Sequence, residues 1–212
     1  MGSLVGVAHG FTTRRGGVSS GHLSSLNLAR RPGESDDALQ TNWERVAYSL
    51  APSLGARSIA VVSQVHGARV VHVDAPSGAL HPAGEADALV TAEPGVVLAV
   101  RTADCVPVLL ASPHGIAAVH AGWRGTVADI VGEALRVGAT VLGVTPARVR
   151  AAIGPCISGR RFEVGPEVVA GLRALGLADA TFGLHTGPRG RPHVDLRGAN
   201  RALLVRAGVP DA

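Results

Sequence analysis

Two short apolar runs on either side of a turn constrain the fold of this chain more than any other segment. The runs are Val106–Ala111 and Ile116–His120, and the residues between them read Ser-Pro-His-Gly. Apolar, β-prone runs around a turn that contains Pro and Gly predict a β-hairpin. We suppose that Ala111 pairs with Ile116, and this pairing fixes the register of the whole hairpin.

The register decides whether a thiol and an imidazole share one face of the sheet. Pro107 then lies opposite His120, and Cys105 points to the same face as Pro107 because side chains alternate along a strand. Cys105 and His120 become diagonal neighbours, with Cα atoms roughly 7–8 Å apart. A metal ion or a thiol–imidazole hydrogen bond can close that gap, whereas a slip of one residue would place the two side chains on opposite faces.

A second histidine, His66, ends another strand-like run, which reads SIAVVSQVHG. Two imidazoles and a thiolate suit Zn²⁺ or copper, and zinc with three protein ligands keeps its fourth position for water or substrate. The alternative is purely structural, since a histidine at a strand end is usually a satisfied polar group and a buried cysteine is usually a small hydrophobic residue. The spacing of His66, Cys105 and His120 leaves both interpretations open.

The remaining pattern predicts helices around a central group of strands. We expect helices over Asp36–Leu50, Thr126–Val137, Gly165–Leu175 and Gly198–Ala207. The expected N-caps are Ser35 or Asp36 for the first helix and Thr126 for the second, which should end near Gly138. Strands are expected at 58–63, 69–74, 87–91, 95–101, 106–111, 116–120, 148–153 and 193–196. This order, with no repeat and no long linker, predicts one domain of the α+β class over residues 1–212.

Composition excludes several classes of protein. The chain has 212 residues, of which 46% are hydrophobic, so it can bury a substantial core. Its 20 basic residues are all Arg and are scattered, without the dense basic run expected for nucleic-acid binding. No run is long enough for a transmembrane helix, and the N-terminus does not resemble a signal peptide. We therefore expect a cytoplasmic protein in which Cys105 and Cys156 are both free thiols.

Seven blocks of the sequence resemble those of the YfiH family, also called the laccase-domain or polyphenol-oxidase-like family. In chain order they are FTTRRGGVSSG at 11–21, QVHG at 64–67, ADALVT at 86–91, VRTADCVPVLL at 100–110, AAVHAGWRGT at 117–126, AAIGPCISGRRFEVGPEV at 151–168 and HVDLRGANRALL at 193–204. The combination of TADC with HAGWRG is specific, and the resemblance spans nearly the whole chain.

The resemblance implies a four-layer α/β/β/α fold with a zinc or copper site made by His66, Cys105 and His120. It also implies phosphorolysis of adenosine, inosine and methylthioadenosine, together with deamination of adenosine. The expected partners are therefore a nucleoside and phosphate, bound by a monomer or a homodimer. On this basis Cys105, His120 and Asp104 are the catalytic candidates.

Three further residues are candidates for binding phosphate or substrate: Arg14, Arg124 and Asp87. Arginine is a good bidentate partner for phosphate, and the glycines that follow Arg14 in TTRRGG allow the backbone to approach a ligand closely. Asp87 and Asp104 are equally candidates for strand-end caps or for residues that orient the metal ligands. Arg124 has the alternative of a simple ion pair with a carboxylate.

Two other functional classes remain open. Cys105 and His120 can act as the nucleophile and base of a thiol hydrolase or amidase, and some relatives are linked to editing of cell-wall precursors. The chain ends at GVPDA, where relatives usually continue into a Cys-rich turn and an Arg-rich block, so a non-catalytic remnant is the other alternative. True polyphenol oxidation is disfavoured, because one His₂Cys site is far short of the several coppers of a laccase.

Overall fold

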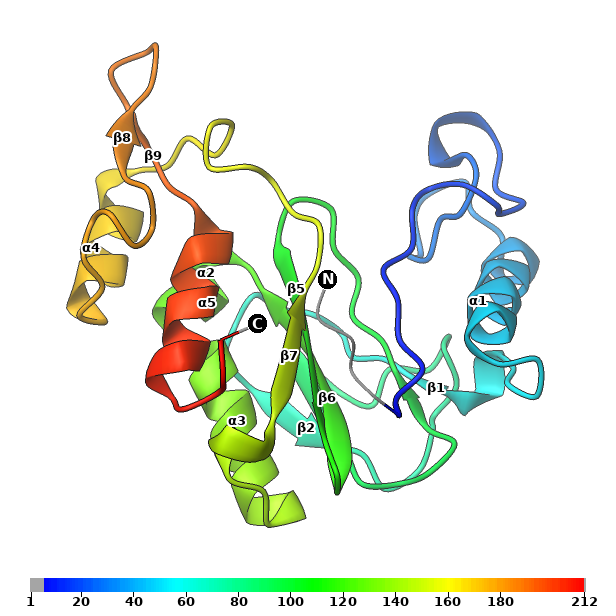
Figure 1. Ribbon diagram of the computed structural model, residues 1–212. Helices are drawn as coiled ribbons and strands as arrows, with labels where there is room; N and C mark the ends of the chain where they lie inside the picture. Colours follow the sequence, from blue (N-terminus) through cyan, green and yellow to red (C-terminus); the bar gives the residue numbers. More distant parts are fainter. Residues whose placement is uncertain (1–5, 212) are drawn as a thin grey trace.

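A five-stranded sheet forms the centre of the computed structural model, which describes residues 6–211 (Figure 1). Residues 1–5, where the expected lack of a signal peptide would apply, and Ala212 lie outside the described residues. The strand order is β2 (Val70–His72), β3 (Ala88–Thr91), β6 (Gly115–Ala121), β5 (Val106–Ser112) and β7 (Arg150–Ile153). Neighbouring strands are antiparallel except for the β2–β3 pair.

The hairpin predicted from the sequence is the β5–β6 pair, and its register is confirmed. Ala111 pairs with Ile116, and Pro107 pairs with His120. The ladder closes at the pair of Ser112 and Gly115, so that Pro113 and His114 form the turn. This register places His120 opposite Pro107, as expected if Cys105 and His120 share one face of the sheet.

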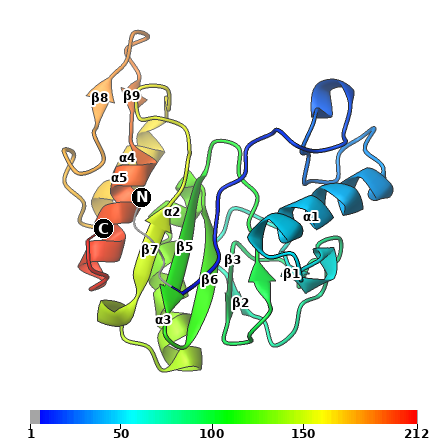
Figure 2. The same ribbon diagram turned by 45° about the vertical axis from the view of Figure 1, so that its right-hand side comes forward.

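The core separates into layers because alternate residues of each strand pack in opposite directions. On β3, Ala88 and Val90 pack against the helices, whereas Leu89 points to the other face. There it meets a small parallel ladder of β1 (Ile59–Ala60) and β4 (Val97–Leu98) through Ala60. Ile59 points away from Leu89 and packs against Trp43 of α1 (Asp36–Leu50). The layers are therefore helices, five-stranded sheet, small ladder and α1, the expected α/β/β/α order (Figure 2).

Several helices have the expected positions. α1 runs from Asp36 to Leu50, and the Ser35 hydroxyl accepts a hydrogen bond from the Ala38 N–H at 3.1 Å, which identifies Ser35 as the N-cap. The later helices are α4 (Pro166–Ala174) and α5 (Leu196–Arg206), and three short 3₁₀ turns occur at Gly21–Leu23, Ala56–Ser58 and Pro146–Arg148. No helix in the described part of the chain combines the length and apolar character needed to cross a bilayer.

The single helix expected over Thr126–Val137 is wrong. The segment forms two helices, α2 (Trp123–Val127) and α3 (Ile130–Leu142). Between them Asp129 has a left-handed backbone with φ of 55°, and its carboxylate caps α3 by accepting from the Gly132 N–H at 3.3 Å. Thr126 is not the cap, because its buried hydroxyl accepts a hydrogen bond from Asn200 instead.

Some strands are shorter than expected. The 58–63 and 95–101 segments contribute only β1 and β4, two residues each, although residues 59–62 are all buried. The apolar runs therefore predicted correctly that these residues are buried, but not how many of them pair in a β-ladder. The strand expected at 193–196 ends at His193 of β9 (Pro192–His193), which pairs with β8 (His185–Thr186), because Asp195 already caps α5.

Candidate metal centre

The carboxylate of Asp87 organises the loop that carries His66. Its Oδ1 accepts the His66 N–H at 2.9 Å, and its Oδ2 accepts the N–H groups of Val65 at 3.3 Å and Gly67 at 2.6 Å. His66 has φ of 60°, a left-handed conformation that is uncommon for a residue other than glycine. Asp87 itself is completely buried. Its hydrogen bonds therefore offset the backbone strain and hold His66 over the end of β6.

The same carboxylate orients His120. Nδ1 of His120 lies 2.8 Å from Oδ1 of Asp87, and the His120 N–H donates to the Asp87 carbonyl oxygen at 2.7 Å. An ionised carboxylate only accepts hydrogen bonds, so Nδ1 carries the proton and Nε2 is left with a free lone pair. A carboxylate behind an imidazole in this way is the usual support of a metal-ligating histidine.

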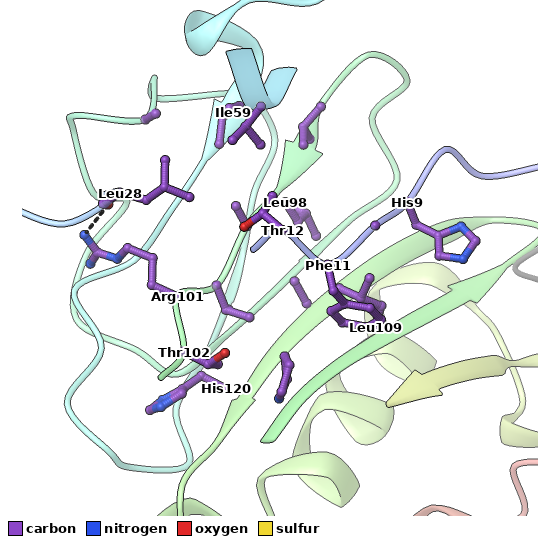
Figure 3. Close-up of a pocket in the computed structure, with 18 of the residues that line it drawn as sticks. His9, Phe11, Thr12, Leu28, Ile59, Leu98, Arg101, Thr102, Leu109 and His120 are labelled. Atoms are coloured by element: carbon purple, nitrogen blue, oxygen red, sulfur yellow. Dashed lines mark hydrogen bonds between the residues drawn. The ribbon is translucent and has the colours of Figure 1, made fainter. Parts of the chain in front are cut away.

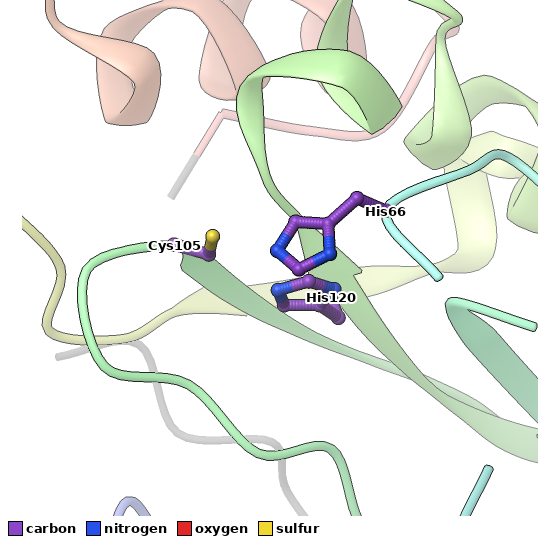
Figure 4. Close-up of side chains that lie close together, drawn as sticks. All are labelled: His66, Cys105 and His120. Atoms are coloured by element: carbon purple, nitrogen blue, oxygen red, sulfur yellow. The ribbon is translucent and has the colours of Figure 1, made fainter. Parts of the chain in front are cut away.

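His66, Cys105 and His120 converge on one small volume (Figure 4). Their candidate ligand atoms all lie within 4.8 Å of one another, and the two imidazole centroids are 4.9 Å apart with planes at 83°. Gly122 leaves this volume open, because a Cβ there would lie 3.0 Å from His66 Cδ2 and 3.1 Å from Cys105 Sγ. The donor set and the space fit one Zn²⁺ or copper ion.

Burial favours the neutral forms of Cys105 and His120. It raises the pKa of the Cys105 thiol, and the charges of Asp104 and Asp87 raise that pKa further. Burial also lowers the pKa of His120, outweighing the hydrogen bond to Asp87, which acts in the opposite direction. Cys105 is thus a protonated thiol at neutral pH unless a cation stabilises the thiolate, which is the electrostatic contribution expected of a metal ion.

The cluster opens into a cleft of about 2000 Å³. The cleft runs between the five-stranded sheet on one side and the N-terminal segment, α1 and β4 on the other (Figure 3). Apolar side chains such as Phe11, Leu98 and Leu109 form much of its lining. An apolar cleft with a few convergent polar groups at one end is the usual form of a small-molecule site.

The structure places the other predicted site residues in different surroundings. Asp104 is exposed at the cleft beside Cys105, and Arg14 also lines the cleft while its Nε donates to the Ser24 carbonyl oxygen at 2.9 Å. Arg124 is exposed outside the cleft lining, with its guanidinium 4.3 Å from the centroid of the Trp123 ring. The hydrogen bonds of the Asp87 carboxylate are all to the QVHG loop and to His120, and Asp87 does not line the cleft.

Sequence reasoning missed Gln64, Arg101 and Asn42. Gln64 joins the QVHG loop to the TADC segment, since its amide accepts from the Arg101 N–H and donates to the Arg101 carbonyl oxygen, both at 2.8 Å. Asn42 accepts from the Val18 N–H at 2.8 Å and donates to the Asn27 carbonyl oxygen at 2.8 Å, which orders the Gly-rich segment. Asn42 could have been noticed as a polar residue beside the apolar stripe of α1. The spacing of Gln64 and Arg101 in the sequence gives no indication of their contact.

The fold and the site together define an α/β/β/α protein with a His₂Cys cluster that lines a cleft of about 2000 Å³. Residues 8–212 match the family described as "Multi-copper polyphenol oxidoreductase laccase". The chain therefore belongs to this family, the YfiH family. Protein YfiH of Bacillus licheniformis has the same fold, with a TM-score of 0.86 and 32% sequence identity; the match covers 95% of this chain and 78% of that one. YlmD of Geobacillus stearothermophilus also has this fold, with a TM-score of 0.86 and 34% identity; the match covers 94% of this chain and 76% of that one.

Relatives of this chain are named for nucleoside chemistry. A purine nucleoside phosphorylase of Deinococcus radiodurans is 47% identical over 97% of this chain and 77% of its own length. A protein of an unknown prokaryotic organism, named adenosine deaminase RL5, is 40% identical over 95% of this chain and 79% of its own length. These names support an enzyme that processes nucleosides, at the level of the family.

Proposed function

We propose that this chain is a metal-dependent purine nucleoside phosphorylase that acts on adenosine, inosine and methylthioadenosine and also deaminates adenosine. The observation that carries the proposal is the convergence of the His66, Cys105 and His120 ligand atoms within 4.8 Å at one end of the cleft. The names of the relatives supply the reaction class, and the cleft has room for a nucleoside.

In this proposal, different residues would bind the metal, orient the histidines and transfer protons. His66, Cys105 and His120 would hold a zinc or copper ion, which when bound supplies Lewis acidity. Asp87 keeps both histidines in their ligating orientation. Asp104, exposed beside Cys105, is the candidate for moving a proton in deamination, and the apolar lining of the cleft offers a surface for the purine base. Of the two arginines first expected to hold phosphate, only Arg14 lines the cleft.

The thiol hydrolase alternative rests on the closeness of Cys105 and His120. It requires a thiolate in the metal-free protein, whereas burial and two carboxylates raise the pKa of Cys105. Polyphenol oxidation has weaker support, because residues 6–211 contain a single group of three or more side chains able to hold a metal. The nucleoside enzyme is therefore the function that the site supports best.

Metal content and turnover test this proposal together. Purified protein should contain about one zinc or copper ion per chain, measured by mass spectrometry of metals. It should release adenine from adenosine only when phosphate is present, and form inosine without it. Cys105→Ala should lose the metal and both activities, because one of three ligands is removed, whereas Cys156→Ala should keep them.

Two results would overturn the proposal. Full activity of metal-free protein, abolished by alkylation of Cys105, would favour the thiol hydrolase. Stoichiometric metal without turnover of any purine nucleoside would leave a binding protein.

A further inference from the structure

Arg101 lies in the cleft without a carboxylate partner (Figure 3). Its side chain is partly buried, and it forms no salt bridge with any residue of the described range. A charged group withdrawn from water is costly unless it is paired or well hydrogen-bonded. Arg101 is therefore a partly buried positive charge without a negatively charged partner among the described residues.

The protein satisfies little of the hydrogen-bonding capacity of the Arg101 guanidinium. Nη1 donates to the Leu28 carbonyl oxygen at 3.5 Å and Nη2 donates to the Val62 carbonyl oxygen at 3.3 Å. Both distances are beyond the usual range for N–H···O bonds. Since a guanidinium has five N–H donors, most of them remain available to a ligand in the cleft.

A second arginine, Arg31, adds positive charge to the part of the cleft that contains Arg101. Arg31 lines the same cleft and also forms no salt bridge among the described residues. The pKa of Arg101 is lowered first by burial and then by the charge of Arg31. The carboxylates that line the cleft, Glu93 and Asp104, pair with neither arginine. Arg31 follows Leu28 by three residues, and Leu28 accepts a hydrogen bond from Arg101, so the two arginines belong to the same part of the cleft. An anion bound there would lower the repulsion between their charges.

Arg101 and Arg31 line the same cleft as His66, Cys105 and His120. Arg101 precedes Cys105 by four residues, and Figure 3 shows Arg101, Thr102 and His120 among the residues that line this cleft. A tetrahedral oxyanion held at Arg101 would therefore share the cleft with a nucleoside held near the metal ligands.

We propose that Arg101, supported by Arg31, forms the oxyanion subsite that binds inorganic phosphate for phosphorolysis. The inference rests on the proposed function, and it assigns the phosphate substrate of that reaction to the part of the cleft beside Arg101. In the reaction a phosphate oxygen forms a bond to C1′ of the ribose while the bond from C1′ to the purine nitrogen breaks. The electron pair leaves with the base, which takes a proton from solvent, and the sugar becomes ribose 1-phosphate. Arg101 holds the phosphate through charge-assisted hydrogen bonds and lowers the repulsion between its negative oxygens.

Direct binding of phosphate is the first test, because it does not depend on turnover. Inorganic phosphate is titrated into the metal-loaded protein by calorimetry and by ³¹P NMR line broadening. Arg101→Gln should weaken binding about tenfold or more, because the charge and the fork of donors are both lost. Arg101→Lys should lie between Arg101→Gln and the wild type, because a lysine keeps only the charge. Arg57→Gln, the same change at an exposed arginine outside the cleft lining, should bind like the wild type.

Kinetics supply the second test. Arg101→Gln should raise the KM for phosphate about tenfold or more, while the deamination of adenosine, which needs no phosphate, keeps its rate. If Arg101 only joins Leu28 to Val62, the variant should melt at a lower temperature, and both reactions should respond alike. Circular dichroism and metal content of each variant separate a loss of folding from a loss of phosphate.

The outcomes distinguish this inference from the proposed function. Phosphate affinity of Arg101→Gln equal to that of the wild type overturns the subsite, whatever the turnover. Phosphate binding that depends on Arg101, in a protein that does not cleave nucleosides, supports the anion site and overturns phosphorolysis.

Discussion

At the scale of single residues, Asp87 determines the geometry of the site although it is completely buried. Its two oxygens accept four hydrogen bonds, from the N–H groups of Val65, His66 and Gly67 and from Nδ1 of His120. One carboxylate therefore fixes both histidines of the candidate metal site. Its position in ADALVT marks it in the sequence, but only the folded structure shows which groups it holds.

Asp87→Asn should weaken zinc binding about 10–100-fold, because the amide turns one acceptor into a donor that faces N–H groups. The protein should also lose about 1–3 kcal/mol of unfolding free energy, since a buried donor is left unpaired. Zinc affinity is measured by competition with a chromophoric chelator, and stability by urea denaturation. Asp74→Asn, at an exposed carboxylate, is the control. Wild-type zinc affinity in Asp87→Asn would refute the positioning role.

The site could be predicted in part from single residues. The strand period and the hairpin turn brought Cys105 and His120 to one face, and the structure has that register. His66 was a candidate from its place at the end of an apolar run, and the family resemblance joined it to Cys105 and His120. The spacing alone could not, because its loop depends on a left-handed backbone that no local pattern encodes. Arg101 was missed because its lack of a partner is a property of three-dimensional packing.

At the scale of elements, local signals succeeded where they were strong. The cap at Ser35 and the apolar stripe of α1 predicted that helix with its observed bounds. They failed at the α2–α3 junction, where Asp129 takes a left-handed conformation that an apolar pattern cannot indicate. The parallel pairing of β1 with β4 was also beyond prediction, since it joins segments about forty residues apart.

Ser35→Ala tests the cap of α1. The Ala38 N–H would lose its acceptor, and the unfolding free energy should fall by about 0.5–2 kcal/mol. Zinc affinity should not change, because α1 supplies no metal ligand. Urea denaturation measures the loss, with Ser53→Ala in the exposed turn after α1 as the matched control. A loss no greater than that of the control would contradict the capping role.

At the scale of the whole molecule, the metal cluster depends on the assembly of distant segments. His66 lies in the loop before β2, Cys105 precedes β5 and His120 is on β6, so the three donors meet only when the five-stranded sheet has formed. The cleft likewise needs both the sheet and the layer of α1 and β4. Metal binding should therefore report on the integrity of the fold and not on one loop.

Zinc should accordingly stabilise the native state and not the unfolded chain. At a free zinc concentration about 100 times the dissociation constant, the expected gain is about 2.7 kcal/mol. For a chain of this size, that gain corresponds to a rise in melting temperature of roughly 5–10 °C. Differential scanning calorimetry with zinc, and after removal of the metal with a chelator, measures the shift. Cys105→Ala should show little or no shift, while Cys156→Ala should behave like the wild type. Equal shifts in wild type and Cys105→Ala would mean that zinc stabilises the protein from another place, and that the His₂Cys cluster is not its principal metal site.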